Sequence, residues 1–221
     1  MDFERARYNM IEQQIRPWDV LDQHVLDLLF AVRREDFVPP TWRALAFADL
    51  EIPLVIGGCD TGEVMLAPKV EARMLQALAP KKHETVLEIG AGSGHMAALL
   101  AHCARRVVSA EIRDDLARFA TDNLTHARIG NAAVEHRHGL RAAPGANFEA
   151  IMLSGSVPFV PESLLGRLTV GGRLVAIVGD LPMMTAQRIT RVADRQFAAE
   201  NLFDTVALPL VGFPKKEAFV F

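Results

Sequence analysis

The chain has 221 residues, 50% of them apolar, and a formal net charge of −3 at pH 7. This length suits one α/β domain with an accessory segment, or two small domains, and it allows a sizeable core without disulfides or metal. The charge excludes a global field that would attract nucleic acid or an anionic membrane, and no stretch approaches the ~18 apolar residues of a membrane span.

Two further features of the sequence bear on its compartment. Cys59 and Cys103 lack the spacing of a zinc or C-x-x-C site, so a reducing environment is the simplest expectation. The N-terminus carries charges where a signal peptide needs an apolar run. We therefore expect a cytoplasmic protein.

Residues 1–80 are expected to form a mainly helical accessory segment packed on the main domain. Apolar residues recur at helical spacing, Pro17 and Pro39 interrupt the pattern, and Asp22 suits a helix N-cap. The expected elements are helices over residues 4–15, 22–32 and 41–49, a short strand over 52–56, a loop over 57–62, and a helix that starts at Pro68 and includes 70–78.

Residues 81–221 alternate strand and helix and are expected to form the main domain. Such alternation predicts an α/β fold with a mostly parallel sheet and helices on both faces. A Gly212/Pro214 turn near the end predicts a C-terminal antiparallel hairpin, which nicotinamide-binding Rossmann domains usually lack. The expected strands are 85–89, 106–110, 132–136, 148–153, 173–178 and 187–192, the helices are 94–103, 114–127 and 161–168, and the hairpin joins 205–211 to 218–221.

A glycine-rich loop follows the first strand of this alternation. Gly90, Gly92 and Gly94 stand between a strand and a helix, where glycine permits positive φ and lets backbone N–H groups approach a ligand. Glu88 precedes the loop, and Glu111 follows the next strand about 20 residues on, where an acid binds ribose hydroxyls. The pattern predicts a nucleoside site. The alternative, a glycine turn that only packs strand against helix, leaves both acids unexplained.

The spacing of the glycines bears on which nucleoside binds. The dinucleotide fingerprint G-x-G-x-x-G, started at Gly90, places its third glycine where this chain has His95. An acid at the position of Glu111 also disfavours a 2′-phosphate. The loop therefore favours a nucleoside without pyrophosphate over NAD.

Segments along nearly the whole chain resemble the protein-L-isoaspartate O-methyltransferase family. The glycine loop is common to many methyltransferases, whereas the leader makes the resemblance specific. The leader segments are MIEQQI, VLD, RREDFVP (33–39) and the stretch 48–53, and the later ones are VLEIGAGSG, VEHRHG, FEAIML, LTVGGRLVAIVG and ALPLVGF.

This resemblance implies a class I, Rossmann-like methyltransferase fold and a known chemistry. The cofactor would be S-adenosylmethionine, the product S-adenosylhomocysteine, and the acceptor an isoaspartyl carboxyl of a damaged protein. The cofactor-binding residues would be Glu88, Gly90, Ala91, Gly92, Ser93, Gly94, His95, Glu111, Ile112, Gly139 and Leu140.

The acceptor signature of the family is altered in this chain. The family carries Q-T-I-S-Q-P before the first sheet helix, and its hydroxyl residues line the acceptor site. Aligned on Pro68, the Thr position is Val64 and the Ser position is Leu66, so both hydroxyls are missing. Hydrogen bonds orient an incoming carboxylate, and apolar side chains leave it unpaired. We assign no catalytic residue; the acceptor-loop candidates are Glu63, Val64, Leu66 and Ser154.

A second departure lies at the adenine site. Where the family has G-D-G, this chain has Leu140 between Gly139 and Arg141, and leucine packs on the ring without accepting its amino proton. His136 and His138 would share one face of a continuing strand, but the sequence offers no third ligand, so we expect no metal.

The sequence is compatible with three functions. They are isoaspartyl methylation, methyl transfer to another protein or small-molecule acceptor, and a non-catalytic binding or regulatory role on the same fold. A nicotinamide-dependent dehydrogenase is a more distant fourth. We expect neither nucleic acid nor a membrane as a partner, and the sequence leaves the acceptor and the oligomeric state open.

Overall fold

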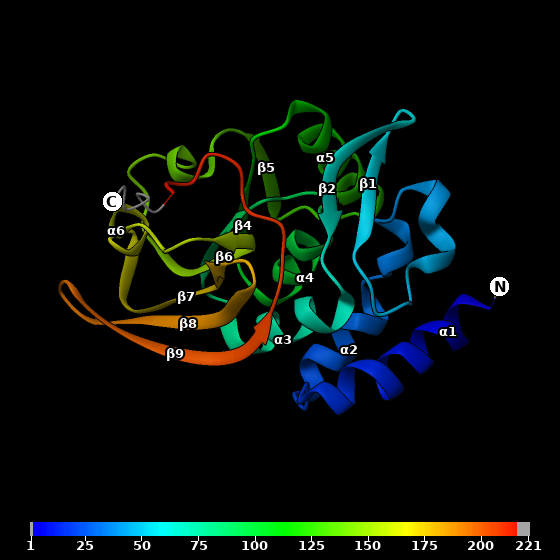
Figure 1. Ribbon diagram of the computed structural model, residues 1–221, viewed down its shortest axis with the longest axis horizontal. Coiled ribbons are helices and arrows are strands. Elements are labelled where there is room, and N and C mark those ends of the chain that lie inside the picture. Colours follow the sequence, from blue (N-terminus) through cyan, green and yellow to red (C-terminus); the bar gives the residue numbers. More distant parts are fainter. Residues whose placement is uncertain (1, 216–221) are drawn as a thin grey trace.

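The computed structural model describes residues 2–215, built around a seven-stranded sheet with a separate β1–β2 hairpin beside it (Figure 1). The sheet order is β5-β4-β3-β6-β7-β8-β9. The strands are β1 (Ile52–Ile56), β2 (Cys59–Met65), β3 (Thr85–Ile89), β4 (Arg106–Glu111), β5 (Ala132–His136), β6 (Phe148–Val157), β7 (Leu168–Asp180), β8 (Met183–Ala193) and β9 (Gln196–Thr205). The helices are α1 (Phe3–Met10), α2 (Gln23–Ala31), α3 (Pro68–Leu78), α4 (His95–Cys103), α5 (Asp114–His126) and α6 (Glu162–Leu165).

The sheet is parallel from β5 to β7 and antiparallel from β7 to β9. In β3 every residue after Thr85 is buried, as expected for a parallel strand that is covered on both faces. The predicted Rossmann-like α/β fold with a mostly parallel sheet is therefore confirmed. None of the helices in the described part of the chain is long and apolar enough to cross a membrane.

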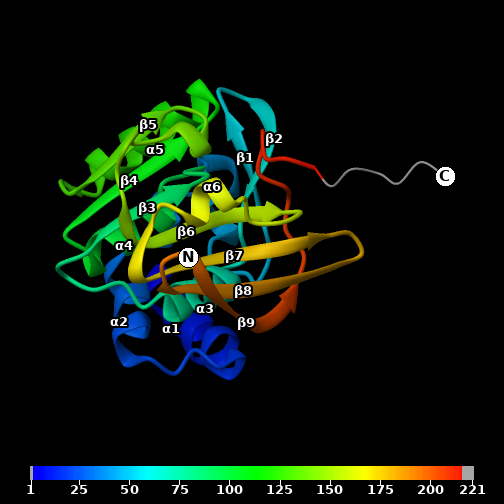
Figure 2. The same ribbon diagram turned by 90° about the vertical axis from the view of Figure 1, so that its left-hand side faces the viewer.

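The two faces of the sheet are covered differently. The face that carries Val86 and Met152 packs against α3, α4 and the N-terminal helices, and Met10 and Leu26 belong to that same cluster. The opposite face packs under a thinner layer that includes Leu164 of α6. Figure 2 shows α1, α2 and α3 gathered on one side of the sheet. Residues 1–80 therefore pack on the main domain through the helices that cover the first of these faces.

Several N-terminal elements differ from the sequence prediction. The predicted helix over 4–15 is α1 followed by a π-helical turn, Ile11–Ile15, and the predicted helix over 41–49 is a 3₁₀ helix, Pro40–Leu45. The predicted loop over 57–62 is wrong, because Cys59–Met65 form β2. Gly57 and Gly58, both at positive φ, make the two-residue turn of a hairpin with β1. The sequence of β2 resembles a loop because several of its residues are polar and exposed.

The antiparallel strands at the end of the sheet come earlier in the chain than the predicted C-terminal hairpin. The antiparallel part of the sheet is made by β7, β8 and β9, which ends at Thr205, and residues 206–211 form one isolated bridge, between Ser156 and Pro209. Residues 218–221 lie outside the described residues. β9 is almost wholly exposed, and its turn places Arg195 rather than glycine at φ 52°, so the sequence carried no hairpin signal there. The predicted helix over 161–168 is the single turn α6, and Leu168 begins β7.

Candidate functional site

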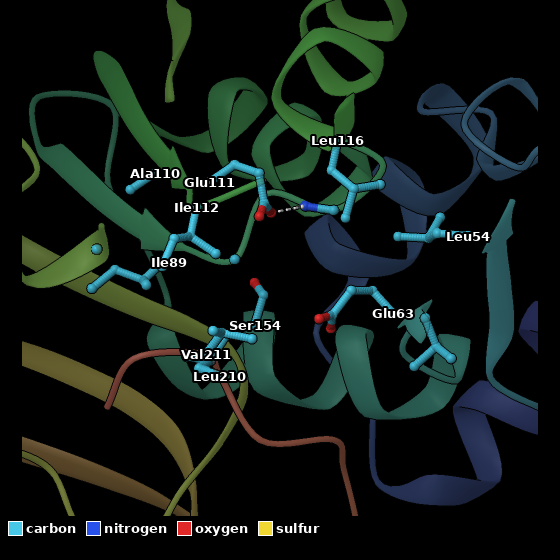
Figure 3. Close-up of a pocket in the computed structure, with 14 residues that line it drawn as sticks. Leu54, Glu63, Ile89, Ala110, Glu111, Ile112, Leu116, Ser154, Leu210 and Val211 are labelled. Atoms are coloured by element: carbon cyan, nitrogen blue, oxygen red, sulfur yellow. Dashed lines mark hydrogen bonds between the residues drawn. The ribbon is translucent and has the colours of Figure 1, made fainter. Parts of the chain in front are cut away.

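A cavity opens where the carboxyl ends of β3, β4 and β6 meet (Figure 3). Ligands of open α/β sheets bind at this edge because the loops of parallel strands leave the sheet on the same side. The sheet edge, the β1–β2 hairpin, the start of α5 and the C-terminal segment all contribute. We call it the outer cavity; its lining residues are Leu54, Glu63, Val64, Ile89, Gly90, Gly92, Ala110, Glu111, Ile112, Leu116, Gly139, Ser154, Leu210 and Val211.

The glycine loop forms the floor of this cavity at positive φ. Gly90, Gly92 and Gly94 have φ values of 94°, 52° and 82°. A Cβ at Gly90 would lie 2.8 Å from the Leu210 side chain, and a Cβ at Gly94 would lie 3.0 Å from the backbone oxygen of Ala120 in α5. Gly90 and Gly92 therefore open the cavity, whereas Gly94 permits α4 to pack against α5.

Glu111, the last residue of β4, is tied to this loop. Its Oε2 accepts the backbone N–H of Gly92 at 3.0 Å, and its Oε1 accepts the backbone N–H of Arg113 at 3.0 Å. Figure 3 shows the carboxylate at the edge of the cavity, held by the bond to Gly92. Each carboxylate oxygen keeps a further lone pair for a ligand hydroxyl.

A smaller cavity continues behind the glycine loop. We call it the inner cavity; its lining residues are Val64, Met65, Leu66, Glu71, Glu88, Gly90, Ala91, Gly92, Ser93, Met96 and Ser154. Glu88 is fully buried there, and it bonds the hydroxyls of Ser109 at 2.6 Å and Ser154 at 2.9 Å. Burial raises the pKa of Glu88 to about 8, against the two serine bonds, which lower it. Glu88 is therefore mostly a neutral acid at pH 7.

The β1–β2 hairpin and the segment that leads into α3 form the opposite wall. Glu63 and Val64 line the outer cavity, and Leu66 lines the inner one. Burial, and then the nearby Glu111, raise the pKa of Glu63, while Arg113 opposes them. This wall presents one acid, Glu63, among the apolar side chains of Leu54, Val64, Met65 and Leu66.

A buried ionic network joins the two walls. Arg34 forms an ion pair with Glu71 of α3 and donates to the backbone oxygen of Leu66 at 2.7 Å. Glu71 also bonds Nδ1 of His95 at 3.0 Å, at the start of α4 beside the glycine loop. Burial alone would raise the pKa of Glu71, but Arg34 and His95 outweigh it and hold that pKa below its ordinary value. The network thus fixes Leu66 relative to the loop.

The structure gathers most of the predicted cofactor residues around the two cavities. Three lie elsewhere: Gly94 packs on α5, His95 is buried in the ionic network, and Leu140 packs against the second core cluster. The residues brought together are Glu88, Gly90, Ala91, Gly92, Ser93, Glu111, Ile112 and Gly139, with all four acceptor-loop candidates Glu63, Val64, Leu66 and Ser154.

The two histidines of the sequence analysis do not form a site together. β5 ends at His136, whose Nδ1 faces Asp114 at 3.4 Å, while His138 bonds the backbone oxygen of Gly212 at 3.1 Å. Within residues 2–215, no group of three or more His, Cys, Asp or Glu could hold a metal ion.

Sequence reasoning missed four apolar residues of the lining. Leu54 and Leu116 face the cavity from β1 and α5, and Leu210 and Val211 reach it from the C-terminal segment. The backbone of Ser156 holds that segment through bonds to Leu208 and Leu210. No local signal marks these residues, because each is an ordinary apolar residue, and Leu54, Leu210 and Val211 lie far along the chain from the glycine loop.

Comparisons with known proteins agree on one family. A sequence model of a protein family, described as "Protein-L-isoaspartate(D-aspartate) O-methyltransferase (PCMT)", matches residues 5–215. The chain is 38% identical over 212 residues to protein-L-isoaspartate O-methyltransferase 1 of Rhodopseudomonas palustris, covering 95% of this chain and 84% of the relative. It is 31% identical to the Petrotoga mobilis protein-L-isoaspartate O-methyltransferase, covering 96% of this chain and 98% of the relative.

A solved structure supports the fold. It is a putative protein-L-isoaspartate O-methyltransferase from Plasmodium falciparum in complex with S-adenosyl-L-homocysteine. It superposes with a TM-score of 0.77 at 19% identity, covering 94% of this chain and 97% of that one. At this identity the likeness concerns the fold.

Proposed function

The chain belongs to the protein-L-isoaspartate (D-aspartate) O-methyltransferase family, and we propose that it transfers the methyl group of S-adenosylmethionine to a carboxylate, with isoaspartyl residues of proteins as the first acceptor to test. The observation that carries this proposal is the placement of Gly90, Gly92 and Glu111 around one cavity at the carboxyl edge of the sheet. Membership of the family, and a structure of the same fold solved in complex with S-adenosyl-L-homocysteine, point to the same ligand.

The residues present fit S-adenosylmethionine. Side chains at Gly90 and Gly92 would fill the floor, so glycine there keeps room for a ligand beside the backbone. Glu111 would bond the ribose hydroxyls, and the apolar Ile112 and Leu116 suit a nucleoside base. When bound, the cofactor supplies an electrophilic methyl group on a sulfonium.

The protein's own contribution is then alignment. The neighbouring acids Glu63 and Glu111 favour a cationic ligand over an anionic one in the outer cavity. Ser154 lines both cavities and offers a hydroxyl that could orient an acceptor carboxylate, whereas Val64 and Leu66 have none. Orientation of this kind lowers a barrier without a protein nucleophile.

Two measurements test the proposal. Calorimetry with S-adenosylhomocysteine should show binding. A radiolabelled methyl group should then be transferred from S-adenosylmethionine to an isoaspartyl peptide, and not to the matched peptide with a normal aspartyl bond. Absence of binding would contradict the proposal and favour a non-catalytic role.

A second candidate is methyl transfer to a different acceptor. The apolar Val64 and Leu66 at the cavity walls favour it, because they suit a smaller or more apolar molecule better than a charged side chain. It predicts tight binding of S-adenosylhomocysteine with no labelling of the isoaspartyl peptide and labelling of a non-carboxylate acceptor in a screen.

We place the activity in the cytoplasm. Both cysteines are free, with Cys59 exposed and Cys103 buried, which fits a reducing compartment.

A further inference from the structure

Glu88 and Ser154 share a hydrogen bond that either group can donate. Ser154 Oγ lies 2.9 Å from Oε1 of Glu88, and Ser109 Oγ lies 2.6 Å from Oε2. Glu88 and Ser109 are fully buried, whereas Ser154 is half-buried and lines both cavities. A change in the protonation of Glu88 therefore reaches the outer cavity through Ser154.

The sheet register explains this arrangement. Glu88 of β3 lies opposite Ser109 of β4 and Met152 of β6, so the three side chains share a face. Ser154 follows Met152 by two residues and also lies on that face. Leu153 is the last residue of β6 that pairs with β3, so Ser154 stands just beyond the paired edge, at the cavity.

We propose that Glu88 is held as a neutral carboxylic acid that donates its O–H to Ser154, which turns the O–H of Ser154 into the cavity to bind the acceptor carboxylate. This inference rests on the proposed function. Ser154 is then the residue that contacts the acceptor, and Glu88 is a positioning residue. Together they supply the donor that Val64 and Leu66 lack.

The position of the proton follows from the burial of Ser109. Glu88 is the only hydrogen-bond partner that the described part of the chain gives the Ser109 hydroxyl, so Ser109 must donate to Oε2. The acid proton is then on Oε1 and points at Ser154. If Glu88 is ionised instead, both hydroxyls donate to it, and Ser154 offers the cavity only lone pairs. An incoming carboxylate would be repelled by them.

The surrounding charges favour the neutral form. Burial is the main reason that the pKa of Glu88 is raised to about 8, and Glu71 of α3 and Glu111 of β4 add to it. The Arg34 cation is already held by Glu71 and the backbone oxygen of Leu66. His95 pairs with Glu71 in the same network, and Glu63 and Arg113 interact with each other and with Glu111 at the outer cavity.

Infrared spectroscopy tests the hydrogen bond without any acceptor. Wild-type protein should show the carbonyl band of a buried protonated carboxylic acid, lost as the pH rises through about 8. Glu88→Gln should lack the band. Ser154→Ala should shift it to higher frequency, because the acid loses the group to which it donates. A missing band, a band that survives in Glu88→Gln, or a band unmoved in Ser154→Ala would overturn the proposal.

The pH dependence of methyl transfer to the isoaspartyl peptide tests the role. In wild type, kcat/KM should fall about tenfold per pH unit above pH 8. Glu88→Gln should remove this fall, since its amide donates to Ser154 at every pH. Ser154→Ala should lower kcat/KM about 10- to 100-fold at pH 7, and Ser154→Thr should restore it.

Ser109→Ala is the matched control. It removes the other hydrogen bond to Glu88, a bond that lowers the pKa of that acid. The fall in kcat/KM should therefore have its midpoint at a higher pH in this variant, while Ser154 still donates to the acceptor. If the same fall above pH 8 remains in Glu88→Gln, the role assigned to Glu88 is wrong. If the infrared results hold and neither peptide is methylated, the acceptor in the proposed function is wrong, and the hydrogen-bond direction stands.

Discussion

The two walls of the outer cavity are built in opposite ways. The sheet wall uses backbone and one carboxylate: Gly90 and Gly92 at positive φ, and Glu111 fixed by two backbone N–H groups. The hairpin wall uses side chains, with Val64 and Leu66 facing inward. Backbone donors change little with sequence, whereas a side-chain wall changes with every substitution. The sheet wall therefore suits a constant cofactor, and the hairpin wall is where an acceptor would be chosen.

The ionic network that connects the walls should give the largest effect. Glu71→Gln removes the carboxylate that pairs with the buried Arg34. Loss of one partner of a buried ion pair costs ~3–5 kcal/mol. Urea unfolding measures the loss. The double variant Glu71→Leu with Arg34→Met should recover most of it, because it removes both charges. A loss below about 1 kcal/mol in the single variant would show that the two walls do not depend on this pair.

The same pair predicts sensitivity to acid. The pKa of Glu71 is lower in the folded protein than in the unfolded chain. Its stabilisation is therefore complete above the ordinary carboxyl pKa of ~4.3 and is lost as the pH falls through the lower, folded value. In Glu71→Gln, the free energy of unfolding should therefore depend less on pH below pH 4 than it does in the wild-type protein.

On the sheet wall, Glu88 should have the opposite pH dependence. Its folded pKa is about 8, above the unfolded value, so between these pH values the folded state holds a proton that the unfolded chain has released. Stability should fall as the pH rises from 5 to 9. Glu88→Gln should remove this dependence on pH, which is worth on the order of 4 kcal/mol between pH 5 and 9, as measured by urea unfolding at pH 5, 7 and 9. Equal slopes in the two proteins would contradict a buried acid.

The cofactor side is probed by Glu111→Ala. Loss of a carboxylate that accepts charge-assisted bonds costs ~1.5–3 kcal/mol, so the Kd for S-adenosylhomocysteine should rise about 10- to 100-fold. Calorimetry measures it. Asp122→Ala, at an exposed acid of α5, is the control and should leave the Kd unchanged. Unaltered binding in Glu111→Ala would place the ligand elsewhere.

The hairpin wall should give the smallest effect. Val64→Thr returns a hydroxyl to the cavity at nearly constant volume and should raise kcat/KM for the isoaspartyl peptide about three- to tenfold, with the Kd for S-adenosylhomocysteine unchanged. Val64→Ala changes the volume without adding a hydroxyl and serves as the control. An equal gain in both variants would indicate relief of crowding rather than hydrogen bonding.

The sheet wall was predictable from sequence for a local reason. The strand 85–89, the glycine loop and Glu111 lie within about one βαβ unit, and their spacing is set by the geometry of that unit. Gly94 and His95 show the limit: the same motif contains residues that pack α4 on α5 or join the ionic network, and spacing does not separate them from residues at the cavity.

The hairpin wall and the apolar lining were not predictable in the same way. β2 reads as a polar loop, and its strand character comes from pairing with β1 across two glycines. Leu210 reaches Gly90 from 120 positions along the chain, and Arg34 reaches Leu66 from 32. Long-range pairing of this kind has no periodic signal.

The sequence by itself determined the fold class, the glycine loop and the acids beside it, because their geometry is fixed by short-range backbone rules. The tertiary structure alone decided what those acids do. Glu88 and Glu111 are alike in sequence, yet one is buried against two serines and the other bonds backbone N–H groups at the cavity edge. Protonation and hydrogen-bond direction depend on burial and neighbouring charge, and only the folded chain sets those.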